Sequence, residues 1–225
     1  MTTRADPRSQ TLRRIYDALY SAYGPQHWWP ARTPNEVVIG AILTQNTNWK
    51  NVERAIRSLR AARALNWRAL HERSVDEIAE LIRPAGTFRV KARRLKAFVD
   101  FLYARYEGRL TAMRDVPLDV LREELLSVSG VGPETADCIL LYALGRPTFV
   151  VDAYTRRMLV RHHLAPHNAD YATIKNLFEA ALPADRALYN EYHALLVEVG
   201  KRHCRMRSSC DGCPLGRFPH DEAVF

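Results

Sequence analysis

The chain has 225 residues, of which 47% are hydrophobic and 26% are charged. This composition is typical of a globular protein and excludes a wholly disordered one. The 33 Lys and Arg residues outnumber the 25 Asp and Glu residues, and the net charge of +8 favours a polyanionic partner without identifying it. No apolar run approaches the roughly 20 residues that span a bilayer, and the N-terminal segment lacks the apolar stretch of a signal peptide. We therefore expect a cytoplasmic protein that associates with no membrane.

Apolar residues recur at intervals of three and four through most of the chain, which predicts helices. Capping residues and prolines mark several of the starts, at Thr33-Pro34, Asn48, Ser74 and Pro117. The β-branched piece 148–151 is too short to found a sheet. The expected fold is all-α, with two helical lobes. Its helices cover about 12–19, 34–42, 48–59, 74–81, 89–106, 118–128, 134–144, 152–164, 170–181 and 187–202.

The most informative segment is 126–137, in which Gly130-Val131-Gly132 separates two short helices. Glycines at such a turn permit positive φ angles and a close approach of the backbone to a ligand. The amides that begin the following helix would face outward, where a phosphate can accept their hydrogen bonds. Such a hairpin grips a nucleic-acid backbone without distinguishing bases. By itself, the glycine pattern leaves a plain helix–helix turn as an equal alternative.

Asp152 follows Gly132 by 20 residues and stands where the next helix should begin. Taken alone, this position indicates an N-cap. The combination of the hairpin, the spacer and Val151-Asp152 resembles the helix-hairpin-helix DNA glycosylases of the endonuclease III superfamily, over about 39–213. In that family this aspartate is catalytic, and the resemblance implies the same role for Asp152.

The resemblance also implies a division of the chain and a partner. We expect a terminal lobe formed by 1–30 and 130–225, a central lobe formed by 31–129, and the hairpin at about 120–144 at their junction. The expected partner is double-stranded DNA that carries a damaged base. We expect a monomer, located with the nucleoid in the cytoplasm.

Two further segments resemble the family's DNA-contacting loops. Gln45 matches a glutamine that enters the duplex beside the gap left by an extruded base. The segment 86–92 matches a loop pressed into the duplex, and it opens the densest basic run of the chain, 89–96, which would otherwise be a solvated helix face. The expected DNA contacts are Gln45, Thr87, Phe88, Arg89, Lys91, Gly130, Val131 and Gly132.

Glu134 departs from the pattern of the bifunctional family members, which have a lysine after the hairpin glycines. That amine attacks the sugar, forms a Schiff base and permits strand cleavage, and a carboxylate cannot do this. We therefore expect a monofunctional glycosylase, in which ionised Asp152 stabilises an oxocarbenium-like sugar and helps to position water. The competing hypothesis is that Lys201 reaches the pocket and supplies an amine. Glu134 itself is either a supporting group of the site or a surface residue.

The tryptophans bear on the substrate. Adjacent tryptophans such as Trp28 and Trp29 are more often packing residues than a binding site. Together with Trp49 and the segments 130–137 and 150–154, however, they resemble the 3-methyladenine DNA glycosylases built on the endonuclease III scaffold. In that branch tryptophans line the base pocket, and the aromatic residue that matches Trp49 stacks on the flipped base.

A base alkylated at a ring nitrogen suits such a pocket because it is cationic. An aromatic face attracts a cation by about 1–2 kcal/mol beyond ordinary stacking. The charged base also leaves readily, so that one aspartate would suffice. We expect removal of alkylated purines, 3-methyladenine first. Removal of oxidised pyrimidines or mismatched thymine is the alternative within this enzyme class, and a DNA-binding relative that has lost catalysis is the alternative outside it.

The four cysteines are unevenly placed, with Cys138 in an apolar stretch and Cys204, Cys210 and Cys213 in the last 22 residues. Clustered thiols in an intracellular chain indicate a metal rather than disulfides. Their spacing resembles the C-terminal [4Fe–4S] loop of the superfamily, which has four cysteines.

The fourth cysteine of that loop is missing, because position 219 is Pro219. His220 follows it and is the candidate fourth ligand. Zinc bound by three cysteines and a histidine is an alternative, and a loop that binds no metal is another. With either metal we expect a structural role that presents Arg205, Arg207 and Arg217 to phosphate.

Overall fold

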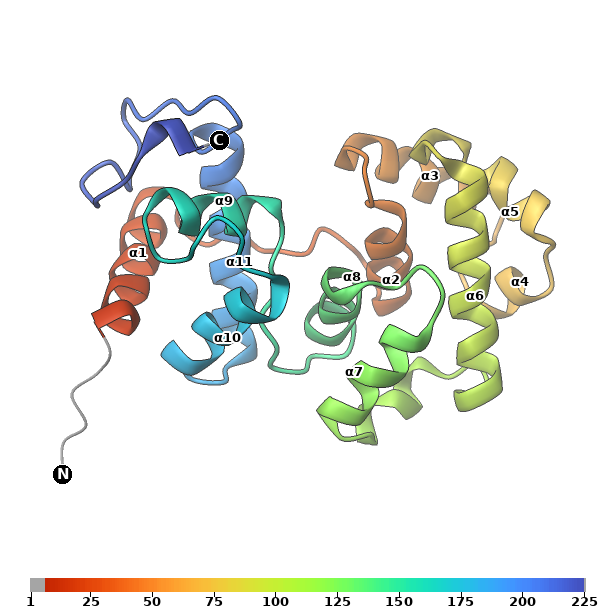
Figure 1. The fold of residues 1–225 in the computed structure, drawn as a ribbon. Helices are drawn as coiled ribbons and strands as arrows, with labels where there is room; N and C mark the ends of the chain where they lie inside the picture. Colours follow the sequence, from red (N-terminus) through yellow and green to blue (C-terminus); the bar gives the residue numbers. More distant parts are fainter. Residues whose placement is uncertain (1–6, 225) are drawn as a thin grey trace. The chain divides into compact units, whose positions relative to one another are not determined.

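The computed structural model describes residues 7–224, and it confirms the all-α prediction, since none of these residues forms a strand (Figure 1). No helix within 7–224 combines the length and the apolar character needed to cross a membrane. Short 3-10 segments and one π-helical turn, η3 (Ile139–Ala143), supplement the α-helices. The α-helices are α1 (Pro7–Tyr23), α2 (Pro34–Leu43), α3 (Trp49–Ala61), α4 (Trp67–His71), α5 (Val75–Leu81), α6 (Phe88–Tyr106), α7 (Leu118–Ser127), α8 (Pro133–Cys138), α9 (Ala153–Arg161), α10 (Tyr171–Ala181) and α11 (Arg186–Arg202).

The helix starts follow local capping chemistry. The side chains of Thr33 and Asn48 accept hydrogen bonds from backbone amides of α2 and α3, and Ser74 forms a capping box with Glu77 at α5. The sequence did not predict α4, because its five residues are too few to show a helical period.

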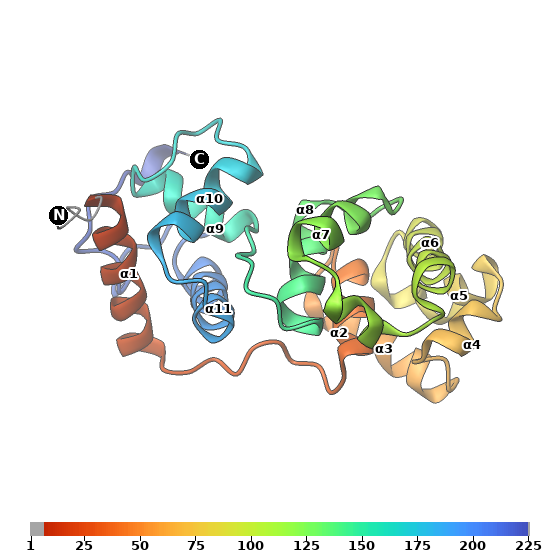
Figure 2. The ribbon, with the colours of Figure 1, turned by 90° about the horizontal axis from the view of Figure 1, so that it is seen from below.

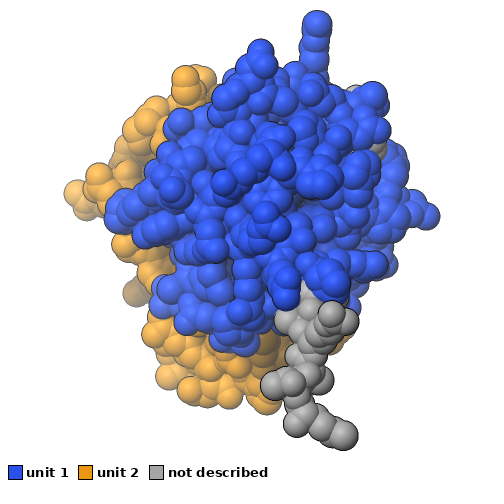
Figure 3. All heavy atoms as spheres, turned by 90° about the vertical axis from the view of Figure 1, so that its left-hand side faces the viewer, with its two compact units in different colours: residues 1–30, 147–225 blue, residues 31–146 orange. Residues whose placement is uncertain are grey.

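The chain divides into two compact units, residues 31–146 and residues 1–30 with 147–225 (Figure 3). We call them the central unit and the terminal unit. The expected division differs at one boundary, because it assigned 130–146 to the terminal lobe. In the structure α8 and η3 pack on α2, whose residues 36–43 are all buried, and they therefore belong to the central unit.

The terminal unit is built around α11, which packs against α9 and α1, while α1 also contacts α10 (Figure 2). Its aromatic core includes the stacked rings of Phe149 and Phe178, whose centroids lie 3.9 Å apart. The Tyr192 hydroxyl donates to the Leu12 carbonyl over 2.7 Å and joins α11 to α1. The non-helical segment 147–152, whose residues 148–151 are buried, leads into α9.

Candidate active site and DNA-binding elements

Asp152 is the N-cap of α9. Its Oδ1 accepts hydrogen bonds from the Thr155 amide (2.7 Å) and the Thr155 hydroxyl (2.9 Å). The side chain of Asp152 is 13% exposed. Oδ1 therefore caps the helix. Oδ2 takes no part in the cap and is the oxygen that could interact with a substrate.

Oδ2 of Asp152 faces His193 of α11, whose Nε2 lies 3.7 Å away. His193 is 4% exposed. Burial lowers the pKa of His193 below its usual value of 6.5, Asp152 opposes this shift, and Lys201 adds to it. A neutral imidazole beside Asp152 places no positive charge against the carboxylate. Sequence reasoning missed His193, for which the only signal is a polar residue on the buried face of a predicted helix.

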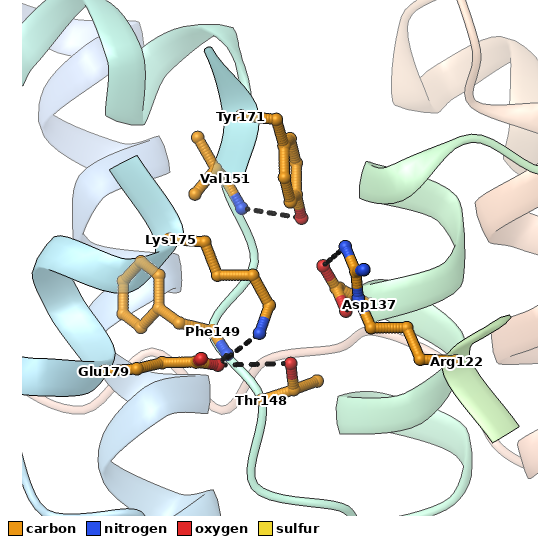
Figure 4. Close-up of polar contacts among 8 residues, drawn as sticks. All are labelled: Arg122, Asp137, Thr148, Phe149, Val151, Tyr171, Lys175 and Glu179. Atoms are coloured by element: carbon orange, nitrogen blue, oxygen red, sulfur yellow. Dashed lines mark hydrogen bonds and ion pairs between the residues drawn. The ribbon is translucent and has the colours of Figure 1, made fainter. Parts of the chain in front are cut away.

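The segment before Asp152 is held by α10 (Figure 4). Glu179 accepts hydrogen bonds from the Phe149 amide (2.8 Å) and the Thr148 hydroxyl (3.2 Å). It also pairs with Lys175 over 2.5 Å. Tyr171 accepts a hydrogen bond from the Val151 amide over 3.3 Å. The backbone on the N-terminal side of Asp152 is therefore fixed by two side chains of one helix.

Trp28 and Trp29 lie in the same unit as Asp152. Their rings meet edge to face, with centroids 5.5 Å apart. The Lys201 ammonium lies 5.4 Å from the Trp28 ring centroid. Because Lys201 also lowers the pKa of His193, its charge acts on both the tryptophan and the histidine that faces Asp152. Four residues that the sequence proposed for the site, Asp152, Trp28, Trp29 and Lys201, thus lie in the same unit as His193.

Gln45 connects the hairpin to α6 within the central unit. Its Nε2 donates to the Gly130 carbonyl (3.1 Å) and to the Thr135 hydroxyl (3.1 Å), and its Oε1 accepts from Arg94. Gly130 has φ +87°, and a Cβ atom there would collide with the Arg94 side chain. Glycine is therefore required at position 130 both by the positive φ and by the close approach of the Arg94 side chain.

The hairpin itself lies between α7 and α8. Asp137 is 0% exposed and binds the Arg122 guanidinium through two hydrogen bonds of 2.9 and 3.2 Å (Figure 4). This bidentate pair ties together the two helices that flank the glycine turn. Val131 is buried, whereas Gly132 and Glu134 are exposed. Gly132 is the N-cap residue of α8, and Glu134 lies in its first turn.

Trp49 is the first residue of α3 and belongs to the central unit. Its indole nitrogen donates to Glu53 over 3.1 Å. The three tryptophans that the sequence groups together thus fall in two units, with Trp28 and Trp29 in the terminal one.

The loop 86–88 precedes α6. Gly86 and Thr87 both have positive φ, and Thr87 and Arg89 are exposed. The half-buried Phe88 ring is approached by the guanidinium groups of Arg83 and Arg89 at 5.3 and 5.9 Å.

Lys91 corrects the expected set of DNA contacts. Its side chain is only 1% exposed, and its ammonium donates to the Ala85 carbonyl over 2.7 Å. Burial lowers its pKa. The expectation of a direct phosphate contact is therefore wrong for Lys91, because the helical period directs this side chain into the protein. There its ammonium binds the backbone just before the loop 86–88.

The C-terminal loop is anchored to α9. Arg157 donates to the Cys204 carbonyl (2.6 Å), and Arg161 donates to the Arg205 carbonyl (2.6 Å) and to the Cys204 sulfur (3.2 Å). The side chains of Arg205, Arg207 and Arg217 are exposed. The helix that Asp152 caps thus also holds the cysteine loop.

Comparison with known proteins finds a family match over residues 39–184, described as HhH-GPD superfamily base excision DNA repair protein. The chain is 50% identical over 211 residues to a candidate DNA repair glycosylase of Methanocaldococcus jannaschii, covering 93% of this chain and 96% of that one. It is 28% identical over 221 residues to the thymine/uracil-DNA glycosylase of Pyrobaculum aerophilum, covering 93% and 91%.

Two solved structures resemble the fold. The 3-methyladenine DNA glycosylase of H. pylori, bound to 1,N6-ethenoadenine, has a TM-score of 0.71 at 26% identity, covering 87% of this chain and 97% of that one. A non-covalent endonuclease III–DNA complex has a TM-score of 0.80 at 24% identity, covering 97% and 96%, and this similarity concerns the fold alone.

Proposed function

Because the chain belongs to the HhH-GPD superfamily of base excision DNA repair proteins, we propose that this DNA glycosylase is monofunctional and removes alkylated purines, 3-methyladenine first. It would hydrolyse the N-glycosidic bond of a damaged base extruded from double-stranded DNA. We propose further that it acts as a monomer, in the nucleoid.

The environment of Asp152 carries this proposal. Thr155 holds Oδ1, while Oδ2 faces a buried histidine whose lowered pKa keeps it neutral at pH 7. The Asp152 carboxylate would stabilise the positive charge that develops on the sugar as the base departs. Its second oxygen can also accept a proton from an attacking water. Glu179 and Tyr171, which fix the preceding backbone, would limit how far the carboxylate moves during the reaction.

The proposal that the enzyme lacks lyase activity rests on Glu134. Its side chain is exposed in the first turn of α8 and is a carboxylate, which forms no Schiff base. Lys201 is the amine that could contradict this proposal, since its charge acts on His193, the residue that faces Asp152. Borohydride trapping on damaged or abasic DNA tests it directly. A trapped covalent complex that is lost in Lys201→Met would make the enzyme bifunctional.

Two observations bear on the substrate and point in different directions. The H. pylori 3-methyladenine glycosylase has the same fold, and Trp28 and Trp29 supply aromatic faces that attract a cationic base. However, the Lys201 ammonium already lies near the face of Trp28 and would repel a second cation there.

The position of Lys201 favours a second candidate function, removal of a neutral pyrimidine such as mismatched thymine or uracil. A neutral base stacks on tryptophan without opposing the lysine charge. The 28% identity to the thymine/uracil-DNA glycosylase of Pyrobaculum aerophilum also supports this candidate.

One experiment separates these functions. Duplexes containing methylated purines, thymine or uracil opposite guanine, or thymine glycol are incubated with the full chain, and base release and strand cleavage are scored separately. We expect release of methylated purines without strand cleavage, and Asp152→Asn should abolish release while DNA binding persists. Release from the mismatched duplexes alone would establish the second candidate. Failure on every duplex would indicate a DNA-binding relative without catalysis.

A further inference from the structure

The C-terminal part of the chain brings together a cysteine, a histidine and a glutamate, and the last two are not ligands of a four-cysteine cluster. Cys210, His220 and Glu222 each offer one ligand atom, and these atoms all lie within 4.8 Å of one another. Among the described residues, neither Cys204 nor Cys213 joins this convergent group. We propose that Cys210, His220 and Glu222 bind one Zn²⁺ ion in place of a [4Fe–4S] cluster.

The spacing of the donors fits a single ion. Zinc bonds of about 2.0–2.3 Å in a tetrahedral arrangement put neighbouring donor atoms roughly 3.3–3.8 Å apart. Nε2 of His220 and Oε1 of Glu222 are already 3.9 Å apart. In a [4Fe–4S] cluster each ligand binds a different iron, so four sulfurs surround the cube instead of converging on one point. The chain lacks the fourth sulfur, because Pro219 stands at its position.

Hydrogen bonds orient two of the three donors. Nδ1 of His220 lies 2.8 Å from the Phe218 carbonyl, which requires the proton on Nδ1 and leaves the Nε2 lone pair for a metal. The Ser208 hydroxyl donates to Oε2 of Glu222 over 3.2 Å and turns Oε1 toward His220. Partners of this kind accompany metal ligands because they fix the tautomer and the orientation of the donor atoms.

Cys204 has a different role. Its sulfur accepts a hydrogen bond from Arg161 over 3.2 Å, and Arg161 also binds the Arg205 and Met206 carbonyls. Cys204 therefore belongs to the attachment of the loop to α9. The variant Cys204→Ser keeps an acceptor for Arg161 but removes the sulfur. It therefore distinguishes a [4Fe–4S] cluster, which would need this sulfur, from the proposed zinc site, which does not.

The zinc ion would connect two parts of the terminal unit. Cys210 lies in the loop after α11, and His220 and Glu222 lie in the last segment of the chain. That segment is joined to α9 by the hydrogen bond from the Asp221 amide to the Arg161 carbonyl, 2.8 Å long. The ion would close the C-terminal segment over the loop, a structural function that is independent of the base removed.

Metal analysis of the full chain tests the site. The protein is purified without oxygen and without chelators, so that a labile cluster survives, and zinc, iron and acid-labile sulfide are measured. We expect about one zinc ion per chain, with no stoichiometric iron or sulfide. Cobalt substitution should give the intense visible bands of a tetrahedral thiolate site. About four irons with sulfide and a broad absorption near 400 nm would overturn the proposal, as would a chain that binds no zinc on titration.

Single variants locate the ligands. Cys210→Ser, His220→Ala and Glu222→Gln should each weaken zinc binding, and Ser208→Ala should weaken it by about tenfold through loss of orientation. Cys204→Ser should retain one zinc ion and is the matched control. Loss of the metal in Cys204→Ser with an unchanged melting temperature would contradict the assignment. Because the readout is metal content, its outcome does not depend on which base the enzyme removes.

Discussion

Oδ2 of Asp152 and Nε2 of His193 lie 3.7 Å apart, and they bring the N-cap residue of α9 against the buried face of α11. Thr155 satisfies the other carboxylate oxygen. His193 is therefore a buried polar side chain that faces Oδ2 and contributes to its electrostatic environment. With Asp152 as the proposed catalytic group, we infer that His193 acts through it as a positioning residue.

Replacing His193 should slow base release without weakening DNA binding. We expect His193→Leu to lower the single-turnover rate by about 10- to 100-fold, because Oδ2 loses a polar partner, and His193→Asn to recover part of the loss. The dissociation constant for DNA, measured by fluorescence anisotropy, should not change. Tyr192→Phe is the matched control, since it removes a buried hydrogen bond from the same helix and should lower only the melting temperature. A wild-type rate in His193→Leu would refute this role.

The stability of the terminal unit should depend on the protonation of His193. Burial is the largest cause of its lowered pKa, Lys201 lowers it further, and Asp152 acts in the opposite direction. Because the folded state binds the proton less tightly than the unfolded state does, this group makes stability fall as pH decreases below 6.5, the ordinary histidine value. We expect the melting temperature to fall less steeply with acidification in His193→Asn than in wild type. Parallel pH profiles would contradict this.

Glu179 should position Asp152 through the backbone rather than through its ion pair. Glu179→Ala leaves the Phe149 amide and the Thr148 hydroxyl without this acceptor, and we expect a loss of about 1–3 kcal/mol in the free energy of unfolding together with slower base release. Lys175→Met removes only the ion pair and should change stability by about 0–1 kcal/mol. Chemical denaturation and single-turnover kinetics measure both effects. Equal losses in the two variants would assign the effect to the ion pair.

The two hairpin glycines should differ in what they support. Gly130→Ala combines a positive φ with a collision against Arg94, and we expect it to destabilise the central unit by about 1–3 kcal/mol. A Cβ atom on Gly132 meets no atom within 4 Å, so Gly132→Ala should leave the melting temperature unchanged. If DNA approaches this backbone, Gly132→Ala should nevertheless bind DNA several-fold more weakly. Wild-type affinity in that variant would exclude a close approach of DNA at Gly132.

The sequence by itself determined most of the helices, most of their starts and the place of Asp152 at one of them. These features depend on interactions within about four residues along the chain, such as the bond from Thr155 to Asp152 or from Glu77 to Ser74. The hairpin was recognisable for the same reason, since a glycine turn and the helix that follows it are contiguous.

Only the tertiary structure decided which side chains face one another. His193 meets Asp152, and Gln45 holds Gly130, because helices distant in the sequence pack together and bring these groups within reach. Lys91 turns inward although it lies in the most basic run of the chain, because helix packing, not composition, selects the buried face. Candidate metal ligands likewise converge only where the chain returns on itself, as Cys210 and His220 do. Local sequence patterns carry no information on the distances between residues that are far apart in the chain. For this reason only the tertiary structure could show these contacts.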